Sequence, residues 1–283
     1  MKNTVLFYSC LIAVVICQLV FQSCDDSVRQ PASTNVFSYK IPRTSSTMRM
    51  VVNDSGQLTS IEDGDVKITY KYGRSDQYKG YDGAIYIEGD SPSDFVLFYN
   101  LNDKGFISDA ILTGRYPRSY TFAYDKSGYL ISMINSSMKV ASGGGKTDFE
   151  YKDGNPICIK DGSSNPLKYY VTYVNDDVAE PIANRGNIEF PWFRVKTYED
   201  LVYAYYGGLL GISTKNLPLK FELDCSEGSP SPFEYWLCDI SWNINADGLP
   251  STMKLHYQLD WPSGCFDSGG FVKDWTILYG YYW

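Results

Sequence analysis

The chain has 283 residues, of which 44% are hydrophobic and 16% aromatic, and it carries 33 acidic against 25 basic side chains. This acidic balance, a formal net charge of −8, argues against binding to nucleic acid or to anionic lipid through charge, because both need clustered Lys and Arg. The 25 tyrosines and 24 glycines are typical of an antiparallel β protein, since tyrosine favours pleated, half-buried surfaces and glycine allows tight turns.

The first residues predict a signal for export. A short charged start, Met1–Asn3, precedes an apolar run over Val5–Phe21, and Cys24 stands where polar sequence begins. A small residue just before such a cysteine, here Ser23, resembles the cleavage site of bacterial lipoproteins. We therefore expect four parts: a signal peptide over 1–23, a lipid on Cys24, a flexible tether over 24–35 and a single domain over 36–283. An uncleaved membrane anchor and a secretory signal cut elsewhere are the alternatives.

The rest of the chain is organised as a series of hairpins. Asp or Asn followed by Gly recurs between alternating apolar segments, at Asn53–Leu58, Asn102–Ile107, Asp125–Leu130, Asp153–Ile157 and Asn245–Leu249. Asp and Asn bond their own backbone and Gly adopts positive φ, so the chain reverses at each point. Hairpin units must lie side by side to bury one face, which predicts an all-β, antiparallel, up-and-down meander.

The predicted strands have one apolar and one charged face. Ile68 and Tyr70 alternate with Lys67 and Lys71, and the same alternation occurs over residues 219–224 and 253–261. Because open sheet edges invite aggregation, we expect the meander to close into a water-soluble barrel with aromatic residues inward and charges outward. The last residues, Trp275–Trp283, also alternate, as in the strands of integral outer-membrane barrels, so a membrane-embedded pore is the alternative.

One helix is predicted, near residues 198–210. Thr197 is a suitable N-cap, and Gly207 with Gly208 would end the helix. The residues that share one face at helical spacing are Tyr198, Leu201, Val202, Tyr205 and Leu209. A barrel of many strands has a wide interior, so we expect this helix and the tyrosines to fill it.

Aromatic residues in the second half of the chain form the candidate binding site. Those that suit stacking on a sugar ring or holding a lipophilic ligand are Trp192, Phe193, Tyr203, Tyr205, Tyr206 and Trp236. The alternative is that the same rings only fill the core of a tyrosine-rich fold.

Four cysteines lie beyond Cys24, namely Cys158, Cys225, Cys238 and Cys265. Export permits disulfides, and four cysteines allow three pairings. We expect Cys225 to pair with Cys238 or Cys265, because all three lie late in the chain. No metal site or cofactor is expected, since the chain has no Cys-x-x-Cys motif and only one histidine.

Little in the sequence favours catalysis. The single histidine, His256, lies on the polar face of a predicted strand, and no Gly-x-Ser-x-Gly elbow exists. Carboxylate pairs for glycoside hydrolysis could come from Glu189, Glu199, Asp200, Asp239 or Asp260, but with 33 acids such pairs are expected by chance. We therefore expect a protein that is not an enzyme.

Several features together resemble a known family. They are the lipidated start, the Asp-x-x-Gly hairpins ending in Tyr-x-Tyr, the segment Tyr206–Gly211 and the pair Leu217-Pro218. They are similar to a family of Bacteroidota lipoproteins described as a domain of unknown function with a porin-like β-barrel fold, over roughly residues 50–283. Asp25 and Asp26 resemble the tag that sends such lipoproteins to the outer face of the outer membrane. The resemblance implies a lipid-anchored protein of the outer membrane and brings no activity, catalytic residue or cofactor.

The expected function is that of a non-catalytic binding or structural module facing the cell surface or the periplasm. Its ligand would be a glycan or a hydrophobic small molecule. Two alternatives make different structural demands. A glycan-active hydrolase requires two convergent acids about 5–10 Å apart, and a membrane-embedded pore requires an apolar outer belt about 25 Å tall.

Overall fold

The computed structural model describes most of the chain after residue 41. The described residues are 42–43, 49–63, 66–89, 95–114, 117–136, 145–162, 166–195, 199–224, 235–260 and 271–281. The predicted signal peptide, Cys24 and the tether lie outside these residues.

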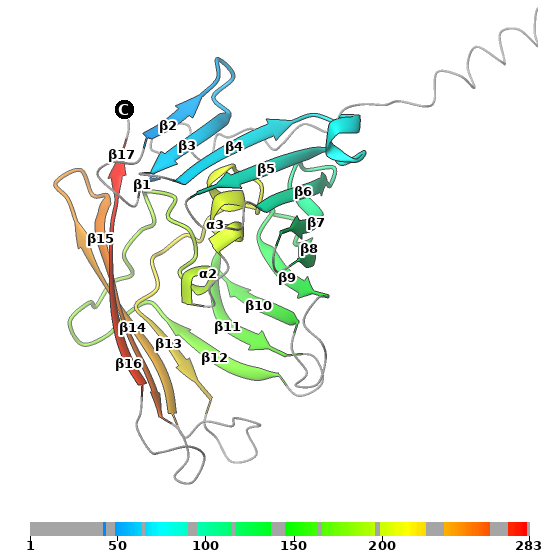
Figure 1. Cartoon of the computed structure of the whole chain (residues 1–283). Coiled ribbons are helices and arrows are strands. Elements are labelled where there is room, and N and C mark those ends of the chain that lie inside the picture. Colours follow the sequence, from blue (N-terminus) through cyan, green and yellow to red (C-terminus); the bar gives the residue numbers. More distant parts are fainter. Residues whose placement is uncertain are drawn as a thin grey trace, which may run out of the picture.

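One antiparallel sheet of fifteen strands forms most of the described structure (Figure 1). Its first strands are β2 (Arg49–Val52), β3 (Leu58–Asp63), β4 (Val66–Tyr72), β5 (Gly83–Glu88), β6 (Phe95–Leu101), β7 (Ile107–Thr113), β8 (Arg118–Tyr124) and β9 (Leu130–Asn135). The others are β10 (Lys146–Lys152), β11 (Asn155–Asp161), β12 (Leu167–Thr172), β13 (Lys220–Leu223), β14 (Tyr235–Ile244), β15 (Pro250–Asp260) and β16 (Phe271–Leu278). Each strand pairs with its neighbours in sequence, so the predicted up-and-down meander is confirmed.

The sheet curls into a barrel shape but is not closed by a continuous ladder. The two edge strands, β2 and β16, do not pair with each other. Instead β1 (Pro42–Arg43) pairs with β17 (Gly280–Tyr281), which follows β16 after one residue. Among the described residues the fifteen-stranded sheet is therefore not closed by hydrogen bonds, as the predicted barrel requires, and the two-residue ladder forms a separate sheet.

The hairpin turns have the predicted chemistry. The side chain of Asn102 accepts hydrogen bonds from the N–H groups of Lys104 and Phe106, at 2.9 and 3.1 Å. Gly105 completes that turn with a φ of 79°. Asp125 accepts in the same way from Gly128, at 2.7 Å. Because each turn satisfies its own backbone, the register of each hairpin is specified locally.

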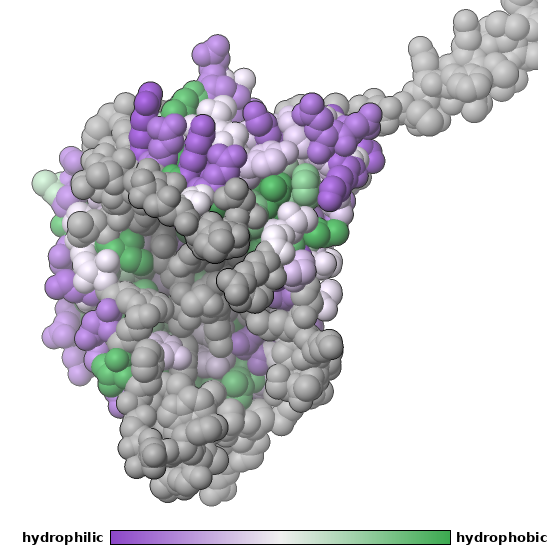
Figure 2. Space-filling model, in the orientation of Figure 1, coloured by the Kyte–Doolittle hydropathy of each residue, from purple (hydrophilic) through white to green (hydrophobic). Residues whose placement is uncertain are grey.

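The two faces of the sheet also differ as predicted. On β4, Ile68 and Tyr70 are buried in the core, while Lys67 and Lys71 are exposed. On β15, Met253 is buried and its neighbour Lys254 is exposed. Hydrophilic residues cover most of the coloured surface over β2–β4 in Figure 2, with separate, smaller hydrophobic patches elsewhere. Apolar burial therefore drives the curl of the sheet inward.

Two short helices lie inside the curved sheet (Figure 1). They are α2 (Trp192–Val195) and α3 (Glu199–Tyr206), and both belong to the long connection between β12 and β13. The prediction of an internal helix near 198–210 is confirmed, although α3 ends at Tyr206, where Gly208 adopts a φ of 72°. The Tyr70 hydroxyl on β4 donates to the carbonyl of Tyr203 on α3 at 2.9 Å, which ties the helix to the wall. No described helix is both long and apolar enough to cross a membrane.

Candidate functional site on the outer wall

The aromatic residues that the sequence nominated for ligand stacking lie in the core. Trp192, Phe193, Tyr205 and Tyr206 are buried, and Tyr203 is partly buried against the same cluster. The Trp192 ring lies 4.9 Å from that of Tyr169 and 5.6 Å from that of Phe221. These ring faces are covered by the chain itself, as the core-filling alternative requires. The side chain of Trp236 lies outside the described residues.

The carboxylates considered for hydrolysis do not converge in the described structure. Glu189 is buried, where it accepts hydrogen bonds from the hydroxyls of Tyr206 at 2.9 Å and Tyr279 at 3.5 Å. Asp239 is exposed and lies opposite His256 on the outer face of β14 and β15. The two carboxylates are therefore on opposite sides of the wall. The side chains of the other three candidates, Glu199, Asp200 and Asp260, are not described.

The segment 207–219, here called the strap, runs along one rim of the barrel. Its Leu209 carbonyl accepts from the N–H of Ile107 at 2.8 Å, beside the turn between β6 and β7. The N–H of Ile212 donates to Gly128 in the turn between β8 and β9 at 3.1 Å, and that of Lys215 donates to Gly154 in the next turn at 3.0 Å. Successive hairpin turns are thus bonded to one crossing segment, and the interior beneath it is filled by α2 and α3.

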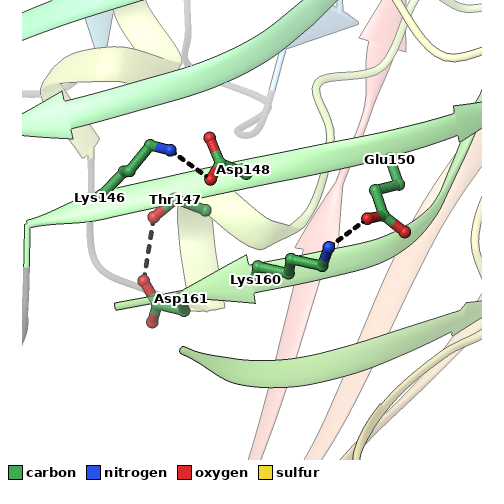
Figure 3. Close-up of polar contacts among 6 residues, drawn as sticks. All are labelled: Lys146, Thr147, Asp148, Glu150, Lys160 and Asp161. Atoms are coloured by element: carbon green, nitrogen blue, oxygen red, sulfur yellow. Dashed lines mark hydrogen bonds and ion pairs between the residues drawn. The ribbon is translucent and has the colours of Figure 1, made fainter. Parts of the chain in front are cut away.

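One part of the outer wall carries paired charges. Lys146 contacts Asp148 at 2.7 Å, and Lys160 forms an ion pair with Glu150 across β10 and β11 (Figure 3). The Thr147 hydroxyl donates to Asp161 at 3.0 Å, but Thr147 is buried and shares a face with Phe149, so this bond lies on the inner side of the sheet (Figure 3). The two exposed ion pairs add about 0–1 kcal/mol each to stability, so their main effect is a locally neutral, hydrated surface.

A second part of the outer wall, over β5 to β7, is aromatic instead. We call the group Tyr78, Tyr81, Tyr86 and Phe98 the outer aromatic patch. On β6, Leu97 and Tyr99 point into the core, so Phe98 between them points outward, yet only 7% of it is exposed. Something outside the sheet must therefore cover this strand.

The cover comes from the connection between β4 and β5. This segment forms the 3-10 turn η2 (Asp76–Tyr78), which is capped by the Ser75 hydroxyl accepting from the N–H of Gln77 at 3.2 Å. The chain then turns back through Lys79, whose φ is 55°. It brings the Tyr81 ring to 5.8 Å from that of Phe98, at an interplanar angle of 27°.

The tyrosines of the patch remain partly accessible. Tyr78, Tyr81 and Tyr86 are each intermediate between buried and exposed. Burial raises the pKa of Tyr86, and the nearby Tyr78 raises it further, so the Tyr86 phenol is a neutral hydrogen-bonding group at neutral pH. The Lys79 ammonium lies 5.3 Å from the centre of the Phe98 ring, in a cation–π arrangement. The patch thus offers aromatic faces, hydroxyls and a cation together.

No residue of the outer aromatic patch was predicted from the sequence to bind a ligand. The signal that could have found them is the run Phe95–Tyr99, which is apolar at every position instead of alternating. A strand without a polar face is buried on both sides, so it requires a second layer. The connection between β4 and β5, which carries Tyr78 and Tyr81, supplies that layer.

The described cysteines are free. Cys158 and Cys238 are both buried thiols. Of the three cysteines considered for a disulfide, only Cys225 and Cys265 then stay available, and both lie outside the described residues. A bond between those two stays a prediction.

Comparison with known proteins identifies the family of this chain and solved structures with a similar fold. A family model described as a domain of unknown function (DUF4595) with porin-like fold matches residues 38–250. The chain belongs to this family. A porin-like protein from Bacteroides uniformis superposes with a TM-score of 0.56 at 16% identity, over 86% of this chain and 95% of that chain. A second porin-like protein, from Bacteroides vulgatus, gives a TM-score of 0.33 at 10% identity, over 85% and 97%. No curated protein matches.

The expected porin-like fold is thereby confirmed, and the family assignment carries no activity. In this porin-like domain the strap bonds to one rim and the helices occupy the interior. The accessible chemistry of the described residues lies on the outer wall.

Proposed function

We propose that this chain is a non-catalytic binding module of the bacterial outer membrane, anchored by lipid on Cys24, and that its ligand is a glycan held on the outer aromatic patch. The observation that carries the proposal is the covered Phe98 ring on the outer wall, with the Tyr81 ring stacked against it and Tyr78 and Tyr86 also partly accessible. Tyrosine combines an apolar ring with a polar tip, which suits the alternating C–H and hydroxyl surfaces of a sugar.

The described interior favours the outer wall over a carrier or a pore. A carrier of a hydrophobic small molecule needs an apolar cavity, whereas Trp192, Leu201 and Tyr206 leave at most 1% of their surfaces exposed. A pore needs a continuous apolar belt on its outside, whereas Lys67, Lys71 and Glu150 are exposed on the outer face. A glycan bound on the outer wall requires neither an apolar cavity nor an apolar belt.

The anchor can be tested separately from the ligand. Cys24→Ala should abolish incorporation of radiolabelled palmitate and release the protein from the membrane fraction, because the thiol is the proposed site of the diacylglycerol. Cys158→Ala, which changes a buried cysteine of the domain, is the matched control and should keep the label. Palmitate labelling that persists in Cys24→Ala would overturn the proposed anchor.

The glycan site is tested by electrophoresis of the full chain through native gels that contain one polysaccharide each: dextran, arabinogalactan, pectin or chondroitin sulfate. We expect at least one to retard the wild-type protein, and the double variant Tyr78→Ala/Tyr86→Ala to lose that retardation. Tyr170→Ala is the matched control, because Tyr170 is 49% exposed on the outer face of β12, in the charged part of the wall.

Thermal unfolding of each variant first establishes that the fold is intact. Retardation by none of the four polysaccharides, or equal loss in the Tyr170→Ala control, would refute the proposed site.

A further inference from the structure

Two lysines lie beside the outer aromatic patch without an acidic partner. Among the described residues, neither Lys71 nor Lys79 makes an ion pair with a carboxylate. By contrast, Lys146, Lys160 and Lys220 elsewhere on the outer wall are each paired with an acid on β10 or β13. Both cations next to the patch are therefore available to a ligand.

The strand register places Lys71 in line with the patch. Lys71 on β4 is directly opposite Ala84 on β5, and Ala84 is directly opposite Phe98 on β6. Directly opposed residues share a face, and adjacent strands are about 4.8 Å apart, so the Lys71 and Phe98 backbones lie about 10 Å apart on the outer face. A lysine side chain can span much of that distance along the wall.

Lys79 approaches the same ring from the connection above it. The backbone N–H of Lys79 bonds the carbonyl of Asp76 at 3.1 Å, which holds the residue in its left-handed conformation at the end of η2. Its ammonium lies over Phe98, 5.3 Å from the ring centre. The exposed carboxylate of this connection is that of Asp76, while the carboxylate of Asp82 is buried and accepts from the N–H of Leu101 at 2.9 Å.

We infer that the glycan bound on this patch is anionic, with carboxylate or sulfate groups that contact Lys71 and Lys79. This inference rests on the proposed glycan function. In a chain with a net charge of −8, an anionic polymer is repelled by most of the surface. Lys71 and Lys79 offset that repulsion at the outer aromatic patch, where the sugar rings would stack. The patch therefore favours an anionic glycan.

The test compares two probes with the same sugar backbone, one charged and one neutral: hexagalacturonate and its full methyl ester. Isothermal titration of the full chain at low ionic strength should give tighter binding of the acid than of the ester. Lys71→Gln/Lys79→Gln should weaken binding of the acid about five- to tenfold, as expected for two exposed ion pairs, and leave the ester unchanged. Raising the salt concentration should remove the same preference. Lys146→Gln, at a lysine that already has an acidic partner, is the matched control and should change neither affinity.

The outcomes separate the two proposals. Equal binding of acid and ester, both lost in Tyr78→Ala/Tyr86→Ala, would overturn the anionic preference and leave the glycan site standing. Binding of neither probe, together with retardation by a neutral polysaccharide, would also overturn the inference alone. Binding of neither probe and retardation by no polysaccharide would overturn both.

Discussion

The hydroxyl of Tyr99 occupies the space that a side chain on Gly83 would need. A Cβ built on Gly83 would lie 2.3 Å from the Tyr99 hydroxyl oxygen and 2.6 Å from the carbonyl oxygen of Lys71. The same hydroxyl donates to that carbonyl at 3.1 Å, which fixes the ring across β4, β5 and β6. Gly83→Ala should therefore destabilise the domain by about 3 kcal/mol, the upper range for overpacking, because one of the clashing atoms is backbone. Urea denaturation measures this change.

A double-mutant cycle identifies the cause. Tyr99→Leu removes the ring from above Gly83, so the cost of Gly83→Ala should be smaller in the Tyr99→Leu background than alone. Strictly additive costs would show that the two residues do not compete for the same space.

Glu189 should be important for stability because it joins the internal segment to the last strands. Its two carboxylate oxygens accept from the hydroxyls of Tyr206 and Tyr279 in a buried environment. Glu189→Ala takes this acceptor from both hydroxyls and should lower the free energy of unfolding by about 3 kcal/mol. Glu189→Gln, which keeps one acceptor oxygen, should cost less.

The matched control is Glu222→Ala on the outer wall. Glu222 contacts Lys220 at 2.9 Å, and 43% of its side chain is exposed. Loss of this pair should change the free energy of unfolding by at most about 1 kcal/mol. Equal effects of the two substitutions in urea denaturation would contradict a structural role for Glu189.

The buried tyrosines predict a loss of stability at alkaline pH. Burial raises the pKa of Tyr70, Tyr99 and Tyr124 well above the ordinary value of 10.0. Above pH 10 the unfolded chain therefore binds fewer protons than the folded one, so stability is full below pH 10 and falls as pH rises further. Each tyrosine contributes a slope of about 1.4 kcal/mol per pH unit.

Phenolate absorbance and circular dichroism, recorded together, check this expectation. A fraction of the tyrosines should ionise near pH 10, and the rest only when the circular dichroism signal shows unfolding. Complete ionisation near pH 10 with an unchanged fold would contradict the burial of these side chains.

The cysteines should divide into two classes. Burial raises the pKa of Cys238 to about 12, and burial followed by the nearby Glu150 raises that of Cys158. At pH 8 both should resist iodoacetamide until the protein unfolds, because the thiolate is the reactive form. Peptide mapping without reductant should find Cys225 linked to Cys265. A linkage that includes Cys238 would contradict the free thiol in the structure.

The meander was predictable because its signals are local. Turn residues such as Asn102 and Asp125 satisfy their own backbone, and alternation as in Ile68 and Tyr70 sets which side chains of a strand share a face. The internal helix was predictable for the same reason. The helical spacing of its apolar residues and the glycine that follows it, Gly207, are both read within one short segment.

The candidate site was not predictable in the same way. Trp192, Tyr205 and Tyr206 look like binding residues in sequence, but a barrel interior needs large side chains and buries them. Tyr81 and Phe98 are seventeen residues apart on different elements, and only the fold brings their rings together.

By itself, the sequence determined the strand pattern, the turns, the alternation of side chains between the two faces of each strand and the internal helix, because each depends on interactions between near neighbours. The tertiary structure decided what depends on distant contacts. It gave the separate ladder between β1 and β17, the strap bonded to successive turns and the patch formed where one connection folds over β6. The physical reason is close packing. An aromatic ring on the outer face of the sheet is buried only where another segment of the chain packs over it.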